Sequence, residues 1–251
     1  MDYFTYKNGV LHAEEVAITD IAAAVGTPFY CYSTATMSRH YQVLAGSLEG
    51  SGARICYAVK ANSNQAVIRT FVELGAGADV ISGGELHRAM AAGAAPDTIV
   101  FAGPGKTRDE LAQALAAGIY QFNVESEPEL RLLSTVAAAM GKVAPVSIRV
   151  NPDVDAGTHE KITTGRKQNK FGIPIDRATA IFDLGAALPG LAMLGVAVHI
   201  GSQITDLAPF EESFDRALKL IDELRAAGHE IRRCNLGGGL GIPCGGETPP
   251  P

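Results

Sequence analysis

Lys60 is the residue whose type and position most directly suggest chemistry. It follows five apolar or small residues, 55–59, and two asparagines and a serine come within four residues after it. An apolar run bounded by turn formers predicts a buried strand, which places Lys60 at a strand end. Burial in an apolar pocket lowers the pKa of an amine and suits a lysine to form a Schiff base. A lysine that reaches from the strand end to the surface is the alternative.

Further polar groups follow other predicted strands. The strands are predicted at 54–59, 78–81, 98–102, 120–124, 145–150, 194–199 and 231–236, and most are separated by amphipathic segments. Parallel strands place their carboxyl ends on one face, where α/β proteins carry their sites. We therefore expect one group of side chains there: Lys60, Asp79 with Ser82, Gly103, Glu125, Arg149 with Asn151, His199 with Ser202, and the glycines Gly237, Gly238 and Gly239.

Helix signals separate these strands. Three Ser/Thr-x-x-Glu sequences, at 82–85, 107–110 and 126–129, predict capping boxes at helix starts. Glycines at 93, 118, 141 and 228 predict helix ends. Phe210, Phe214, Leu218, Ile221 and Leu224 recur at helical spacing and predict one buried face.

Alternating strands and helices predict an α/β fold with a parallel sheet. Seven strands are predicted, whereas a closed (β/α)8 barrel needs eight, and the final residues 246–251 have no apolar periodicity. An open sheet is one interpretation. We favour an incomplete TIM-like barrel, whose first and seventh strands would have exposed edges.

The first residues carry weaker signals. Asn8-Gly9 predicts a hairpin turn, and a short helix is expected at Ile18–Val25, ended by Pro28. Phe29–Tyr32 resembles a strand and Ser33–Leu48 a helix. The expected division is an N-terminal segment 1–28, a barrel 29–245 and a tail 246–251.

Composition excludes several classes of function. The chain has 251 residues, is 47% hydrophobic and carries a formal net charge of -6, so no basic footprint for nucleic acid is present. We find no signal peptide and no apolar run near the ~18 residues that span a bilayer. The four cysteines lack metal-binding spacing, and Cys56 and Cys234 are predicted to be buried thiols. These features favour a cytoplasmic protein without a metal or membrane partner.

The glycine run Gly237–Gly239 follows the seventh predicted strand. Consecutive glycines let backbone N–H groups approach a phosphate, and barrels often bind phosphate after strands seven and eight. A flexible turn is the alternative. His199 could titrate or lie against a ring, although a structural histidine is also possible, and Ser202 could donate to a phosphate or phenolic oxygen. A Schiff-base lysine, a phosphate loop and a flanking histidine together suggest pyridoxal phosphate.

Seven motifs in this order resemble those of the fold-type III pyridoxal-phosphate decarboxylases, a family that includes diaminopimelate, ornithine and arginine decarboxylases. They lie at 57–62, 77–86, 122–126, 149–152, 170–172, 199–202 and 235–239. The stretch 155–172 is most similar to family members that act on diaminopimelate. The resemblance implies an alanine-racemase-type barrel, and decarboxylation of meso-2,6-diaminopimelate to L-lysine and CO2 in lysine biosynthesis.

The same resemblance implies the site residues. Lys60 would form the Schiff base with pyridoxal 5'-phosphate, and His199 would stack on its ring. Asp79, Arg149 and Ser202 would line the cofactor pocket, and Gly237–Gly239 would serve its phosphate.

The family pattern continues beyond Pro251. By resemblance, an eighth strand with a glutamate for the ring nitrogen would follow, then a β-domain whose cysteine and tyrosine complete the site of a homodimer. Residues 1–28 would pack with that domain, and the 251-residue chain alone is expected to be inactive. The alternatives are action on ornithine, arginine or a carboxypolyamine, or a non-catalytic fragment that binds cofactor or a partner.

Overall fold

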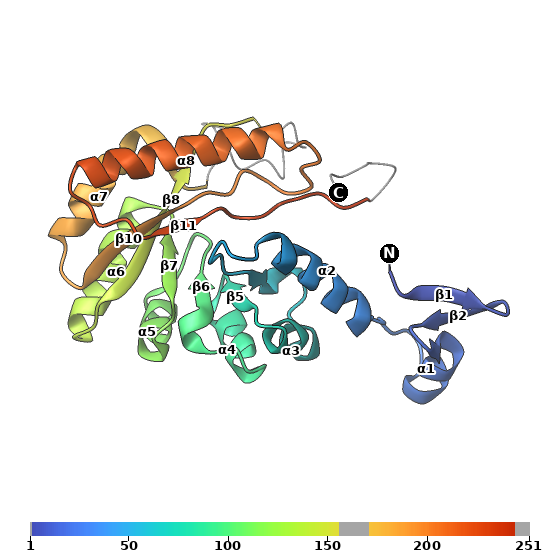
Figure 1. The fold of residues 1–251 in the computed structure, drawn as a ribbon. Coiled ribbons are helices and arrows are strands. Elements are labelled where there is room, and N and C mark those ends of the chain that lie inside the picture. The colour runs from blue at the N-terminus through green and yellow to red at the C-terminus, as the bar shows by residue number, and fades with distance from the viewer. Residues whose placement is uncertain (1, 156–170, 244–251) are drawn as a thin grey trace.

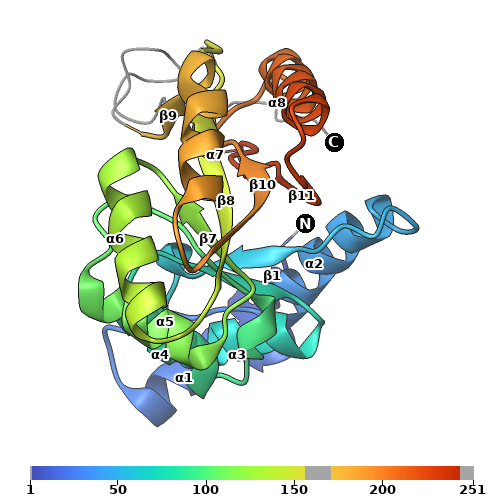
Figure 2. The same ribbon diagram turned by 90° about the vertical axis from the view of Figure 1, so that its left-hand side faces the viewer.

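The computed structural model describes residues 2–155 and 171–243. Its main element is a parallel sheet that curls into part of a barrel (Figures 1 and 2). In pairing order its strands are β11 (Arg233–Asn235), β10 (Leu191–Ala197), β8 (Ala144–Asn151), β7 (Gln121–Val124), β6 (Ile99–Phe101), β5 (Gly77–Val80) and β4 (Cys56–Ala58). The short β9 (Ile173–Pro174) pairs with β8.

Helices connect the strands and cover the outside of the curl. They are α3 (Gln65–Glu73), α4 (Gly83–Ala91), α5 (Arg108–Ala117), α6 (Glu127–Ala139), α7 (Ala178–Ala187) and α8 (Ala208–Ala226). Short 3-10 turns lie at η1 (Val59–Ala61), η2 (Pro96–Thr98) and η3 (Ile175–Arg177). All seven predicted strands are confirmed within a few residues, and so is the incomplete barrel.

The two faces of the strands differ in chemistry. On β8, Val146, Ile148 and Val150 belong to the buried core under the helices. The alternate residues Ser147 and Arg149 point to the inner side of the curl, because successive side chains of a strand face opposite ways. The apolar core therefore lies between sheet and helices, and the inner surface is left for polar groups.

Helix starts follow the predicted capping residues but only partly the predicted geometry. Thr107 and Glu110 form a reciprocal capping box at the start of α5. Ser82 and Ser126 cap α4 and α6 through their side-chain oxygens. Their glutamates instead accept the N–H of the residue before the cap: Glu85 from Ile81 at 2.8 Å and Glu129 from Glu125 at 3.3 Å. The prediction of three capping boxes was thus right for one.

Helix ends are confirmed at the four predicted glycines, all of which have positive φ. The predicted face of α8 is partly wrong. Leu218 is 53% exposed, and the buried face is formed by Ala217, Leu220, Ile221 and Leu224. The helix buries a stripe shifted by one residue, which places Leu218 on the solvent side.

The N-terminal residues form a small separate sheet of β1 (Phe4–Lys7), β2 (Val10–Ala13) and β3 (Val16–Ala17), with α1 (Ile18–Val25). The Asn8-Gly9 hairpin and α1 are confirmed, and α2 (Thr34–Ser47) matches the next predicted helix. Gly26 caps α1, with φ of 81°, so the helix ends before Pro28. Residues 29–32 form no strand, and Tyr30 is 89% exposed. The predicted division at residue 28 stays a prediction.

The sheet is open at both sides. Among the residues described, β4 pairs only with β5 and β11 only with β10. No helix is described after β11, so the outward-facing Cys234 is exposed, and the prediction that it is buried was wrong. Cys56 is half-buried, and burial raises the pKa of its thiol to about 11. Cys244 lies outside the described residues.

Candidate active site at the carboxyl ends of the strands

Lys60 lies in η1, one turn that follows β4 directly. Val59 is fully buried beneath it, whereas Lys60 is exposed. The Tyr57 hydroxyl donates to the carbonyl of Asn62 at 3.1 Å, and its ring stacks on Phe71 at 4.4 Å between centroids. The turn that carries Lys60 is therefore anchored on both sides. The half-buried pocket expected for the amine is not formed by the described residues.

Asp79 lies on β5, paired in register with Ala58 of β4. Its Oδ1 atom is buried and has no hydrogen-bond partner among the described residues. Burial raises the pKa of Asp79 to about 6, although the charges of Lys60, Arg149 and Lys106 act in the opposite direction. A carboxylate that is buried with one oxygen unsatisfied is a group poised to accept a hydrogen bond or a nearby cation.

Arg149 and Glu125 form an ion pair on neighbouring strands. The register places Val124 opposite Ile148, which makes Glu125 and Arg149 neighbours on the inner face. Arg149 Nη1 donates to Glu125 Oε1 at 2.9 Å, and the side chains are 12% and 3% exposed. The guanidinium also lies 5.3 Å from the centre of the Phe171 ring. Arg149 is thus a cation held from two sides at the rim of the curl.

His199 follows β10 on the same inner face. Arg149 pairs in register with Ala197, two residues before His199, so the two side chains are diagonal neighbours. Burial, together with the charges of Arg149 and Lys60, lowers the pKa of His199 to about 4, and a hydrogen bond with the Gly238 backbone acts in the opposite direction. At neutral pH this imidazole is uncharged.

The glycine run packs directly on the His199 loop. A Cβ on Gly237 would lie 2.4 Å from the Val198 carbonyl oxygen, and one on Gly239 2.0 Å from that of Gly201. Both glycines have positive φ, and Asn235 Oδ1 accepts the N–H of Gly237 at 2.8 Å. Close loop packing thus requires glycine here whether or not a phosphate binds. Gly238, in contrast, faces open space, where a ligand can approach the backbone.

The remaining predicted positions are less central. Ser202 is exposed, and Ser82 caps α4. Gly103 packs on Ile81 and accepts a hydrogen bond from Lys106, and Asn151 accepts one from the Asp153 N–H. The structure brings Lys60, Asp79, Arg149 and His199 close enough to interact, because the charges of Lys60 and Arg149 act on both Asp79 and His199. The motif 155–172 lies almost wholly outside the described residues.

Two contributors were missed from the sequence. Glu85 acts on Asp79 and raises its pKa, and Lys106 lowers it. Glu85 had been assigned only a capping function, and Lys106 precedes a helix cap in a loop. A signal for Lys106 existed in its two glycine neighbours, Gly103 and Gly105, both with positive φ, which fold the loop back on itself.

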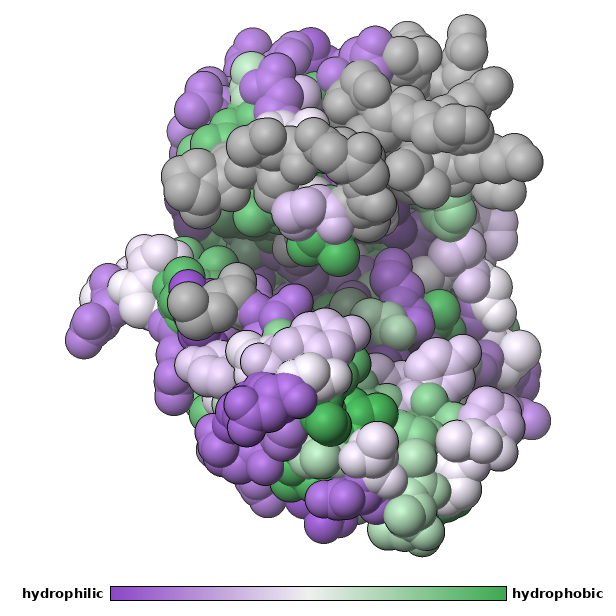
Figure 3. Space-filling view, turned by 90° about the vertical axis from the view of Figure 1, so that its right-hand side faces the viewer, coloured by the Kyte–Doolittle hydropathy of each residue, from purple (hydrophilic) through white to green (hydrophobic). Residues whose placement is uncertain are grey.

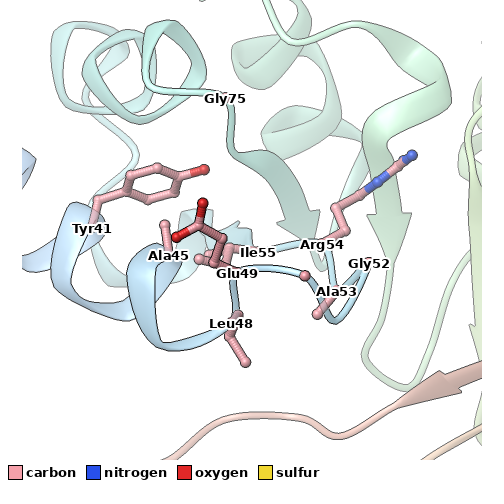
Figure 4. Close-up of a pocket in the computed structure, with 10 residues that line it drawn as sticks. Tyr41, Ala45, Leu48, Glu49, Gly52, Ala53, Arg54, Ile55 and Gly75 are labelled. Carbon is pink, nitrogen blue, oxygen red and sulfur yellow. The ribbon is translucent and has the colours of Figure 1, made fainter.

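The molecular surface is hollowed on one side. Figure 3 shows a cleft across this face, bordered by hydrophilic and hydrophobic residues. A different pocket opens beside the start of β4, between the end of α2 and the following loop (Figure 4). Tyr41, Glu49 and Arg54 line it, and Arg54 points away from the Tyr41 ring. This pocket lies at the amino end of β4 and does not include Lys60.

Comparison with known proteins identifies the family. The profile of the family described as "Pyridoxal-dependent decarboxylase, pyridoxal binding domain" matches residues 34–250. The chain belongs to this family of pyridoxal-dependent decarboxylases. The match covers the barrel and its strand ends, and it confirms the family resemblance found in the sequence.

Individual relatives of this decarboxylase family agree. The diaminopimelate decarboxylase of Vibrio cholerae is 51% identical over 251 residues, which is 100% of this chain and 60% of that protein. That of Pseudomonas aeruginosa is 50% identical over 250 residues, with the same coverage. The chain therefore spans about 60% of the length of these curated relatives.

Solved structures show the same fold. AQ1208 from Aquifex aeolicus has a TM-score of 0.89 and 38% identity, covering 99% of this chain and 57% of that one. Diaminopimelate decarboxylase from Helicobacter pylori, complexed with L-lysine, has a TM-score of 0.87 and 38% identity, covering 92% and 58%. The incomplete barrel is thus part of a known pyridoxal-dependent decarboxylase fold.

The described residues fit a pyridoxal group. They offer an exposed amine at Lys60, an unsatisfied Asp79 oxygen, a neutral imidazole and an open backbone at Gly238. No cluster of metal-ligating side chains occurs in the ranges 2–155 and 171–243. In those ranges, no helix combines the length and apolarity needed to cross a bilayer.

Proposed function

We propose that this chain binds pyridoxal 5'-phosphate at the strand ends and belongs to an enzyme that decarboxylates meso-2,6-diaminopimelate to L-lysine and CO2. The observation that carries the proposal is the convergence of Lys60, Asp79, Arg149 and His199 in a chain of the pyridoxal-binding family. The names of relatives at 42–51% identity, which are diaminopimelate decarboxylases, favour diaminopimelate as substrate.

Each residue has a proposed part. Lys60 is the amine that holds the cofactor's aldehyde, and the neutral face of His199 stacks on its ring. Asp79 accepts a hydrogen bond or balances cationic charge beside Lys60. Arg149 supplies fixed positive charge to the same pocket. Ser202 and the backbone of Gly237–Gly239 hold the phosphate. These groups bind and orient the reactants, whereas bound pyridoxal phosphate supplies a ring that accepts the electron pair left as CO2 departs.

Cofactor binding is tested by absorbance. The purified chain, mixed with pyridoxal phosphate, should gain a band at ~420 nm that is typical of lysine-bound pyridoxal. Lys60→Ala should abolish the band, whereas Lys219→Ala, on the distant α8, should keep it. An unchanged band in Lys60→Ala would reject Lys60 as the binding residue.

Substrate choice is tested with the protein expressed from its complete gene. Incubation with meso-diaminopimelate should yield L-lysine, while L-ornithine should yield little putrescine. Preferential putrescine formation would favour the related polyamine-pathway activity. Pyridoxal binding without any turnover would favour the interpretation as a non-catalytic cofactor-binding protein.

Partners and location follow the proposed activity. We propose a small amino-acid substrate, a homodimeric assembly and a cytoplasmic location, with no nucleic-acid or membrane partner. The support is the acidic net charge of -6, which speaks against a nucleic-acid partner, and the names of the relatives, which are diaminopimelate decarboxylases. Sedimentation of the natively expressed protein, with and without pyridoxal phosphate, would test the assembly.

A further inference from the structure

A buried ion pair lies behind the candidate site. Lys106, in the loop after β6, donates from Nζ to Glu129 Oε1 on α6 at 2.7 Å, and the two side chains are 0% and 7% exposed. The same ammonium donates to the carbonyl oxygens of Gly103 at 2.6 Å and Asn123 at 2.8 Å. All three ammonium hydrogens thus have acceptors, which makes this lysine a fixed charge without a free nucleophilic position.

The pair reaches the active-site strand through Glu129. One carboxylate oxygen accepts from Lys106, and the other, Oε2, accepts the backbone N–H of Glu125 at 3.3 Å. Lys106 also holds the Asn123 carbonyl, two residues earlier on the chain. The end of β7 is therefore held at two backbone positions by one buried pair.

Glu125 passes this constraint to the site. Its carboxylate binds the Arg149 guanidinium at 2.9 Å. Arg149 in turn is the diagonal neighbour of His199 and acts on Asp79. A continuous set of contacts therefore runs from Lys106 through Glu129 and Glu125 to the cation that faces the proposed cofactor pocket.

We propose that Lys106 and Glu129 are positioning residues: they fix the end of β7 and, through Glu125, set the place of the Arg149 guanidinium in the pocket. This inference rests on the proposed cofactor site for its meaning, but its geometry does not depend on the cofactor. The charge of Lys106 also lowers the pKa of Asp79, but the position of Arg149 depends on the pair through Glu125.

The physical reason lies in the burial of both charges. A buried ion pair adds little net stability compared with apolar residues of similar volume, because both ions lose their hydration. The pair instead fixes the position of the backbone, since the ammonium binds two backbone carbonyls and the carboxylate binds one backbone N–H. Such a pair is well suited to hold a strand end in one position where an arginine must be placed.

The titration of His199 reports on the position of Arg149. Lys60 and Arg149 are the charged groups that lower the pKa of His199, whereas Lys106 and Glu129 are not among its causes. If Arg149 moves away, the pKa of His199 rises toward its ordinary value. The chain has six histidines, so the His199 signal in a proton NMR spectrum is assigned by its absence in His199→Gln.

The test compares variants of the cofactor-free chain. Arg149→Met sets the full rise in the pKa of His199. Glu129→Gln, and the double variant Lys106→Met with Glu129→Gln, are expected to give at least half of that rise. The double variant leaves no unpaired buried charge, so it remains informative if the single variant does not fold. Phe182→Leu, a buried change on α7, controls for general loosening.

Two results would overturn the proposal. One is an unchanged pKa of His199 in the folded double variant while Arg149→Met raises it, which would leave the pair a purely structural role. The other is an equal rise in Phe182→Leu. Pyridoxal binding is measured separately on the same variants. If the parent chain does not bind pyridoxal phosphate, the proposed cofactor is rejected, but the His199 result still tests the positioning of Arg149.

Discussion

At the residue scale, Asp79 and His199 are held in environments that favour their uncharged forms, with opposite consequences for pH dependence. Burial raises the pKa of Asp79 to about 6 and lowers that of His199 to about 4. For the acid with a raised pKa, the contribution to stability is present at low pH and is lost as pH rises through 6. For the base with a lowered pKa, the contribution is present above its ordinary pKa and is lost as pH falls.

Asp79→Asn removes the contribution of Asp79 to the pH dependence of stability and leaves that of His199. The amide is neutral at every pH, so this variant should gain stability relative to the parent as pH rises from 4 to 7, because the parent must then bury a charge. The expected relative gain is about 1 to 3 kcal/mol, from the size of the pKa shift. Urea unfolding of the cofactor-free chain at several pH values measures it. A stability difference that does not change with pH would contradict the buried, unsatisfied carboxylate.

Little of this could be foreseen from residue types. The sequence placed Asp79, Arg149 and His199 at strand ends, because strand boundaries follow from apolar runs. It did not show that Glu125 and Arg149 pair, since that depends on the register of β7 against β8. Lys106 was missed because the acceptors that allow it to be buried come from three separate segments, which the flanking glycines alone do not reveal.

At the element scale, the capping residues at the helix starts were predicted correctly, but their glutamates form different hydrogen bonds from those predicted in two of three cases. Glu110 completes the capping box of α5 and also accepts the Gly83 N–H at the start of α4, at 2.8 Å. One carboxylate thus joins two neighbouring helix starts. These hydrogen bonds lower the pKa of Glu110, so its contribution is present at neutral pH and is lost on acidification.

Removing the cap of α5 should be measurable. Thr107→Ala removes the oxygen that accepts the Glu110 N–H, and it should lower the free energy of unfolding by about 1 kcal/mol. Thr135→Ala is the matched control, because its hydroxyl only bonds back to Arg131 within α6. Chemical denaturation at pH 7 compares them. Equal stability of the two variants would show that the box contributes nothing beyond ordinary helix formation.

Strands and helices were predicted well where one face is buried, because apolar runs and caps are local signals. The strand predicted at Phe29–Tyr32 was wrong, because a local run of aromatic residues does not by itself show that the segment is buried. Its aromatic residues look like a strand, but Tyr30 and Tyr32 stack on each other at 6.4 Å and are largely exposed. The prediction that Leu218 is buried was wrong because the buried face of α8 is rotated by one residue, which leaves Leu218 on the solvent side. Helical periodicity alone does not determine this rotation.

At the scale of the whole molecule, the curl brings distant strands together at its amino end. The guanidinium carbons of Arg54, before β4, and Arg233, on β11, lie 4.3 and 3.8 Å from the centre of the Tyr120 ring. Arg233 also donates to the Tyr120 carbonyl at 2.6 Å. Tyr120 therefore links the two edge strands, which have no direct strand pairing among the described residues.

Loss of this ring should weaken the curl. Tyr120→Leu removes both cation–π contacts and should lower the free energy of unfolding by about 1 to 2 kcal/mol. Tyr120→Phe keeps the ring and should be close to the parent. Urea unfolding distinguishes the two. If leucine and phenylalanine variants were equally stable, the stacked arginines would have no part in holding the open barrel.

The central claim is that Lys60 is the amine that captures pyridoxal phosphate. The most direct measurement is borohydride reduction of the chain after incubation with the cofactor, followed by peptide mass mapping. We predict one pyridoxyl group, on the peptide that contains Lys60, and none on the buried Lys106, whose ammonium is fully hydrogen-bonded. Label spread over surface lysines with Lys60 unmodified would contradict it.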